Sequence, residues 1–181
     1  MSAPSVKPIY WSVILPIAAL KLIAHLLTNV NYGLHRDAFL YLALGRHLDF
    51  GYWSNPPLIG WVAWFVQTFL GDSMFAVRLI PTLLGTTILI ITALMARDLG
   101  GGKYAQLLTA FAMLLSPTLI RPSWMFQPVI FDIFFWVLSI YFIIKYLRSK
   151  DKRNVLYFGL TLGLGLLNKY NLAFLLFALI P

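Results

Sequence analysis

The stretch MFAVRLIPTLLGTTILIITALMA, residues 74–96, decides the fold class of this protein. Its one charged residue, Arg78, and its one proline, Pro81, both lie near its start. A helix needs about 20 predominantly apolar residues to cross the hydrocarbon core of a bilayer. This stretch is long and apolar enough, so it predicts a transmembrane helix.

The composition of the whole chain agrees with this prediction. Of its 181 residues, 60% are hydrophobic and 11% are charged, and the mean hydropathy is +0.81. Soluble domains carry about 25% charged residues, so membrane insertion is the simplest interpretation. The net charge of +8 does not indicate a nucleic-acid partner, because the cations cluster in short loops beside apolar runs, as topology signals do. Cysteine is absent, which excludes disulfides and thiolate metal sites.

Further apolar runs predict an all-α, polytopic transmembrane helical bundle. They cover residues 9–30, residues 104–119 (short, and ended by Ser116-Pro117), residues 129–147, and a fifth run from about residue 155. A break at residues 168–171 separates the fifth run from a sixth. The first run is too long for a signal-peptide core, so we expect a retained helix. Because the chain stops inside an apolar run, we expect residues 1–181 to be the N-terminal part of a longer transmembrane domain.

The basic residues predict the orientation. With a cytoplasmic N-terminus, eight basic residues lie inside and four lie outside, which is the asymmetry of inner (plasma) membrane proteins, and we expect a bacterial one. The inside set is Lys7, Arg97, Lys103, Lys145, Arg148, Lys150, Lys152 and Arg153, and the outside set is Arg36, Arg46, Arg78 and Arg121. Residues 31–73 then form an outer loop.

This loop has the composition of two helices that lie at the membrane interface. The first is RDAFLYLALGRHLDF, residues 36–50, with Asp37 near its start and Gly51 as its expected stop. Pro56-Pro57 forbids helix at Asn55 and can begin the second, LIGWVAWFVQTFLG, residues 58–71. The three tryptophans of the outer loop, Trp53, Trp61 and Trp64, suit an aromatic belt at the membrane interface.

Two aspartates are the sharpest candidates for chemistry. Asp132 lies in VIFDIFFWV, where an ionised carboxylate is costly unless it faces a cavity, a partner or water. The structural alternative is a pairing with Arg121 or Lys169. Asp37 alone would be interpreted as a helix N-cap. By the predicted topology both aspartates lie at the outer face, where they are a candidate acid/base or metal-binding pair.

The candidate cations have weaker signals. Lys169 ends a glycine-rich span, where it either extends to the headgroups or holds an anionic phosphate. Lys21 and His25 are four residues apart on the first span and should face the bundle interior. The remaining cations are individually more typical of solvated charges, although each could meet an anion; they are Arg36, Arg46, His47, Arg78 and Arg121.

The run RDAFLYLALGRHLDFGYWSNPPLIGWV, residues 36–62, resembles the first outer loop of the polyprenyl-phosphate-dependent glycosyltransferases of the GT-C fold. The closest group is glycosyltransferase family 39, the protein mannosyltransferase and aminoarabinose-transferase-like proteins. GDSMFAVRLIPTLLG (71–85), FDIFFWVL (131–138) and GLGLLNKY (163–170) are similar to the family's next elements. Two positions depart from the family pattern. Ala38 replaces a Glu, and Asn55 stands where His or Lys is frequent before Pro-Pro.

The resemblance implies an inverting transfer of a sugar from a polyprenyl-phosphate donor to a lipid, glycan or protein acceptor. Asp37 would be the general base and Asp132 its partner, and a divalent metal on these two carboxylates is an open alternative. The residues expected to bind substrate are Lys169, Tyr52, Asn55, Arg46, His47 and Arg121. Two other classes stay open: a transporter or flippase for a lipid-linked substrate, and a non-catalytic membrane scaffold, which would explain Ala38.

Overall fold

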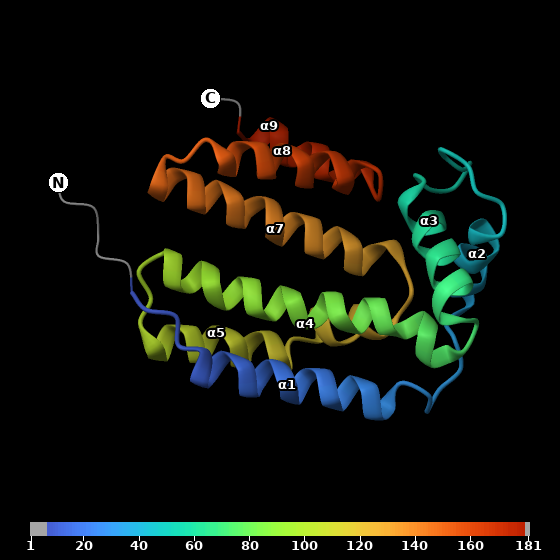
Figure 1. Ribbon diagram of the computed structural model, residues 1–181, viewed down its shortest axis with the longest axis horizontal. Coiled ribbons are helices and arrows are strands. Elements are labelled where there is room, and N and C mark those ends of the chain that lie inside the picture. The colour runs from blue at the N-terminus through green and yellow to red at the C-terminus, as the bar shows by residue number, and fades with distance from the viewer. Residues whose placement is uncertain (1–6, 180–181) are drawn as a thin grey trace.

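The computed structural model describes residues 7–179. The start of the predicted cytoplasmic N-terminus (residues 1–6) and the last two residues of the closing apolar run lie outside this range. Residues 7–179 form helices and connecting segments without a strand, which confirms the all-α prediction. The bundle in Figure 1 consists of helices that lie side by side, while two helices cross one of its ends. The side-by-side helices are α1 (Trp11–Thr28), α4 (Met74–Asp98), α5 (Lys103–Leu115), α7 (Pro128–Ser149) and α8 (Arg153–Leu166), and the crosswise ones are α2 (Arg36–Gly45) and α3 (Leu58–Phe65).

Within the described residues, three helices are long and apolar enough to cross a membrane: α1, α4 and α7. They confirm the predicted runs at residues 9–30, 74–96 and 129–147. Helix α4 is central, because it packs against α1, α5 and α7, and α7 in turn packs against α8. Many large apolar side chains on the outside of these helices are exposed, among them Leu20, Leu27 and Phe111. Such faces suit contact with lipid.

The third predicted run ends at Ser116-Pro117, as expected, and residues 117–119 do not continue its helix. Helix α5 stops at Leu115, and Ser116 has an extended backbone (φ −66°, ψ 116°). Pro117 explains this, because a proline disfavours helical geometry in the residue before it. The chain continues through the short helices α6 (Pro117–Ile120) and η2 (Pro122–Trp124). Helices α5 and α8, with 13 and 14 residues, are short for a full crossing.

The predicted break at residues 168–171 is confirmed. Helix α8 ends at Leu166, and a 3-10 turn, η3 (Tyr170–Leu172), leads into α9 (Ala173–Ala178). Three connecting segments meet where α2 and α3 cross the bundle (Figure 1). They are residues 31–57, which include α2, residues 116–127, which include α6 and η2, and residues 167–171. We call this end the loop end.

The first crosswise helix, α2, is shorter than predicted: it ends at Gly45 and not at Gly51. A Cβ atom on Gly45 would lie 2.7 Å from the Cβ of Ala63, so the glycine lets α2 and α3 approach closely. The residues after Gly45 are held outside the helix by a contact to α3: the Trp61 indole donates to the carbonyl of Asp49 (3.0 Å). Helix α3 follows Pro57 as predicted and continues as a π-helix, η1 (Val66–Leu70), up to Gly71 at φ 91°.

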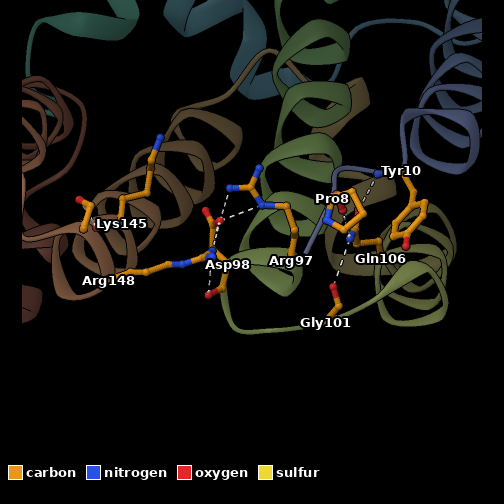
Figure 2. A network of polar contacts seen from close by, with 9 residues as sticks. Pro8, Tyr10, Arg97, Asp98, Gly101, Gln106, Lys145 and Arg148 are labelled. Carbon is orange, nitrogen blue, oxygen red and sulfur yellow. Dashed lines mark hydrogen bonds and ion pairs between the residues drawn. The ribbon is translucent and has the colours of Figure 1, made fainter. Parts of the chain in front are cut away.

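The opposite end of the bundle, which we call the Asp98 end, is held by charged and amide groups (Figure 2). The carboxylate of Asp98 accepts hydrogen bonds from Arg97 and from Arg148 on α7. The fully buried Gln106 of α5 accepts from the Tyr10 amide and donates to the carbonyls of Pro8 and Gly101. These contacts join the N-terminal segment, α4, α5 and α7.

Lys21 and His25 are buried in the bundle, at 1% and 8% exposed, as predicted from their spacing on α1. One imidazole nitrogen of His25 is in hydrogen-bond contact with the carbonyl oxygen of Lys21 (2.9 Å), and the other with the carbonyl oxygen of Ile120 (3.3 Å). His25 therefore links α1 to the connection between α5 and α7.

Candidate functional site

A cavity of about 310 Å³ opens at the loop end. Four parts of the chain surround it: helix α2, the loop before α3, the start of α7 and the segment after α8. The lining residues are Tyr41, Tyr52, Trp53, Ser54, Asn55, Pro56, Pro128, Val129, Asn168, Lys169 and Tyr170. The cavity therefore combines aromatic rings and polar groups with a single lysine.

The loop GYWSNPP forms a rigid wall of this cavity. The amide of Tyr52 donates to the carbonyl of Asn55 (2.9 Å), which closes a tight turn. The Tyr52 hydroxyl donates to the carbonyl of Leu44 (3.1 Å) and accepts from the amide of Asp49 (3.2 Å). The Tyr52 ring also covers Gly60, where a Cβ atom would lie 2.7 Å from the ring. These contacts fix the loop against both crosswise helices.

Two asparagines attach the segment after α8 to one face of α7. Asn168 donates to the carbonyl of Pro128 (3.0 Å), and Asn171 donates to the carboxylate of Asp132 (2.9 Å). Pro128 and Asp132 are one helical turn apart, so the two amides hold the segment at two successive points. Lys169, between them, is exposed and lines the cavity.

Asp132 has an amide partner and not the predicted cation. Among the described residues, neither Arg121 nor Lys169 lies within ion-pair distance of its carboxylate. One carboxylate oxygen accepts from Asn171, while the other is buried without a hydrogen-bond partner in residues 7–179. The suggested pairing with Arg121 or Lys169 is therefore wrong.

Asp37 lies in the first turn of α2, but it is not the cap of that helix. His35 is the N-cap residue, and its ring nitrogen accepts from the amide of Asp37 (3.3 Å). The Asp37 carboxylate accepts from Gln127 (3.3 Å), the residue that precedes α7, and lies 3.3 Å from the guanidinium of Arg36. Its side chain remains 40% exposed. Asp37 is thus oriented by α7 and open to solvent.

Tyr41 connects Asp37 to the cavity. It lies one helical turn after Asp37 on α2 and lines the cavity wall. Burial, and secondarily the charge of Asp37, raises the pKa of the Tyr41 phenol above its usual value. The phenol therefore stays protonated at physiological pH and can donate a hydrogen bond. The spacing of four residues from Asp37 was the sequence signal that could have identified it.

Of the residues predicted to bind substrate, the cavity brings together Tyr52, Asn55 and Lys169. The other three lie outside its lining and are exposed. Arg46 pairs with Asp72 at 4.0 Å, and His47 and Arg121 lie in the turns that follow α2 and α6. Sequence analysis missed Asn168, Tyr170 and Asn171 as site residues, because amides and tyrosines in a predicted break carry no distinct pattern. It also missed Tyr41, on α2.

Asp37 and Asp132 both lie at the loop end, as the predicted topology requires. Their contacts differ, because Asp37 faces Gln127 and Asp132 faces Asn171. No group of three or more His, Cys, Asp or Glu side chains gathers anywhere in residues 7–179. The joint metal site of the two aspartates stays a prediction.

Ala38, which departs from the resembled family's pattern, is 1% exposed and packs in the main hydrophobic core. That core also contains Ile59, Val77 and Phe131. Ala38 also lines a smaller cavity together with His35 and Arg78, so a carboxylate at position 38 would lie at that smaller cavity and not at the cavity of about 310 Å³. The larger cavity therefore does not receive a second acid from this turn of α2.

Comparison with known proteins gives one match. The family model described as dolichyl-phosphate-mannose-protein mannosyltransferase matches residues 54–181, well over half of the chain. No curated protein and no solved structure matches. The matched range contains Asn55, Asp132 and Lys169, whereas Asp37 precedes it. On the strength of this match and of the all-helical bundle, the chain belongs to the dolichyl-phosphate-mannose-protein mannosyltransferase family.

Proposed function

We propose that this protein transfers a sugar from a polyprenyl-phosphate donor to an acceptor at the loop end of the bundle. The observation that carries the proposal is Lys169, a cation in a cavity with no acidic partner among the described residues, held in place by asparagines on either side. A positioned ammonium group suits the phosphate of a lipid-linked sugar. Membership of the mannosyltransferase family supports glycosyl transfer in general.

The remaining lining suits the sugar. Tyr52 and Asn55 come from the rigid loop, and Tyr41 supplies a phenol that stays protonated. Hydroxyl and amide groups of this kind exchange hydrogen bonds with sugar hydroxyls. Trp53 and Tyr170 are strongly exposed at the same cavity and offer apolar ring faces. The donor would therefore lie with its phosphate on Lys169 and its sugar between the tyrosines.

The chemical step assigns Asp37 as general base. Its carboxylate would accept the proton of the acceptor hydroxyl as that oxygen forms a bond to the anomeric carbon. The bond from the anomeric carbon to the donor phosphate oxygen breaks with inversion, and the polyprenyl phosphate leaves with an additional negative charge. Lys169 stabilises that charge. The contact of Asp37 with Gln127 fixes the base relative to α7.

Asp132 would act as the electrostatic partner of this site. Its contact to Asn171 places a carboxylate directly behind the segment that carries Lys169. Because one of its oxygens has no partner in residues 7–179, it can accept a further hydrogen bond or hold a cation.

We further propose that the loop end faces the outside of the membrane. The support is the distribution of basic residues, with eight at the Asp98 end and five at the loop end, where Lys169 joins the four counted from the sequence. Because the chain has no cysteine, single replacements can be labelled without background. Ser54→Cys at the loop end should react with an impermeant thiol reagent in whole cells, and Ser149→Cys at the Asp98 end should not. The reverse pattern of labelling would invert the orientation.

The transfer itself can be tested with purified protein. Radiolabelled polyprenyl-phosphate sugars are incubated with the protein and membrane-derived acceptors, and labelled acceptor should appear together with released polyprenyl phosphate. A parallel experiment in sealed vesicles follows movement of the donor between leaflets. Donor movement without any transfer would contradict the proposal and identify a flippase instead.

A further inference from the structure

A second cavity, of about 110 Å³, lies at the loop end behind the first turn of α2. It is formed by the connection between α1 and α2, by Ala38 of α2, by α4, and by Trp124 of η2 with the segment that follows. Its polar lining groups come from Arg78, His35 and Trp124. It shares no lining residue with the larger cavity, from which the first turns of α2 separate it.

Arg78 is a buried cation in this cavity and is 2% exposed. Its guanidinium donates to the carbonyl of Asn29 and to the carbonyl of Gly33 (2.7 Å), and it lies 4.3 Å above the ring of Trp124. No carboxylate among the described residues comes within ion-pair distance of it. A buried charge with only neutral partners is costly unless an opposite charge joins it.

Trp124 provides an independent observation. Its indole N–H is buried and has no acceptor within residues 7–179. Indole can only donate, so this group requires an acceptor that the described residues do not supply. The main chain here is fixed, because Thr82 of α4 donates to the carbonyl of Ser123 (3.2 Å). The indole thus stays beside Arg78 as an unused donor.

From these contacts we propose that the second cavity is a binding site for a compact oxyanion, a phosphate or carboxylate group. Arg78 would supply the charge and further N–H donors, since its guanidinium has five and only two contacts are made inside the protein. The Trp124 indole would supply another donor. The site is independent of the sugar-transfer proposal, because it uses neither Lys169 nor Asp37.

The purified full chain in detergent tests this site with inorganic phosphate as the probe. Thermal unfolding is followed over a phosphate series against chloride at equal ionic strength, and phosphate should raise the unfolding temperature with a saturable dependence. Trp124→Phe should weaken the apparent phosphate affinity about tenfold or more, the size expected for a lost hydrogen bond to a charged group. Trp64→Phe, at an exposed indole outside the cavity, should match wild type.

Arg78→Gln should abolish the effect, although it also removes contacts that hold residues 29–33. Trp124→Phe keeps the test decisive, because its indole nitrogen makes no contact inside the described part of the protein. A wild-type protein without a phosphate-specific shift, or an equal shift in Trp124→Phe, would overturn the site. So would loss of the shift in Lys169→Ala, because phosphate would then bind in the larger cavity.

A second series distinguishes a free ion from a lipid-borne group. Phosphatidic acid is added to the micelles in place of inorganic phosphate, with phosphatidylcholine as the control lipid. A Trp124-dependent shift that saturates at lower phosphatidic acid content than inorganic phosphate assigns the site to a lipid headgroup. The opposite ranking assigns it to the soluble ion. Phosphatidylcholine carries a zwitterionic phosphodiester, so an effect equal to that of phosphatidic acid would contradict a site for a compact anionic phosphate group.

Discussion

The two ends of the bundle treat charge in opposite ways. At the Asp98 end, two guanidinium groups converge on one buried carboxylate, and Gln106 satisfies three main-chain groups (Figure 2). At the loop end, Lys169 and Arg78 have no acidic partner among the described residues, although Asp37 and Asp132 lie at the same end. The loop end does carry exposed ion pairs, Arg36 with Asp37 and Arg46 with Asp72. The ends differ in the charges that line their interior: within residues 7–179, these are paired at the Asp98 end and left without an acidic partner at the loop end.

This difference indicates a division of roles. The polar groups at the Asp98 end fix the positions of α4, α5 and α7, and their hydrogen bonds are made within the protein, so they are not available to a ligand. Separated charges are costly for the fold, but they leave a cation and a carboxylate free to act on a ligand. Functional sites are where proteins keep such locally unfavourable arrangements. The comparison predicts that substitutions at the Asp98 end reduce stability, whereas substitutions at the loop end reduce activity or binding.

The largest effect should come from Asp37→Asn. If the carboxylate removes a proton from the acceptor, turnover should fall by about 10²- to 10⁴-fold, the usual contribution of general-base catalysis. Folding and donor binding should remain near wild type, because His35 caps the helix and Asn can still accept from Gln127. The measurement is the transfer rate at saturating donor.

The control for this prediction is Asp151→Asn at the Asp98 end, where an exposed side chain accepts from the amide of Arg153 (2.9 Å). Asn can replace it there, so transfer should be unchanged. Full transfer activity in a folded Asp37→Asn protein would remove Asp37 from the mechanism. The main role of the loop end would then be binding.

The next effect concerns stability at the Asp98 end. Asp98→Asn leaves Arg97 and Arg148 without a counter-charge in the described residues, and the free energy of unfolding should fall by about 2 kcal/mol. This is less than for a fully buried pair, because the two arginine side chains are 17% and 20% exposed. Transfer per folded molecule should persist. Unfolding in mixed micelles measures the loss, and an unchanged unfolding free energy would show that this end does not depend on the pair.

Lys169→Ala should weaken donor affinity about tenfold, because it removes a charge-assisted contact to the donor phosphate. Lys169→Arg should retain most of the affinity, since the charge remains. Lys152→Ala, an exposed lysine at the Asp98 end, is the matched control. Titration with labelled donor gives the affinities. If Lys169→Ala binds donor as well as wild type, the lysine only extends to the headgroups.

The smallest effect tests the cavity wall. Gly60→Ala places a methyl group 2.7 Å from the Tyr52 ring, so the ring must shift and the free energy of unfolding should fall by about 1 kcal/mol. Gly163→Ala in α8 meets open space and should raise stability by up to about 1 kcal/mol, because alanine favours helix. Unfolding of both variants in micelles makes the comparison. Equal effects would mean that the GYWSNPP loop is not rigid.

The sequence alone determined the membrane class, the three long apolar helices, the proline start of α3 and the break before Lys169. It did so because apolar length and the backbone restrictions of proline act locally, within a few residues. Asp132 could be singled out for a similar reason, since it is a charge in an apolar run, whereas Asp37 and Lys169 were singled out from their positions in the predicted topology. The helix stop at Gly45 was misplaced, because the close contact with Ala63 that favours it comes from a different helix.

Only the tertiary structure decided which of these groups share a site. It placed Tyr41, Asn168 and Lys169 around one cavity, gave Asp132 an asparagine as partner, and left Arg46 and His47 outside. It also enclosed Arg78 with the unused indole of Trp124. Such pairings depend on which faces of distant helices pack together, and on directional hydrogen bonds between residues tens of positions apart. The local pattern of apolar and charged residues encodes neither the packing of helix faces nor these long-range hydrogen bonds. The sequence therefore identified the charges, and the fold determined their partners.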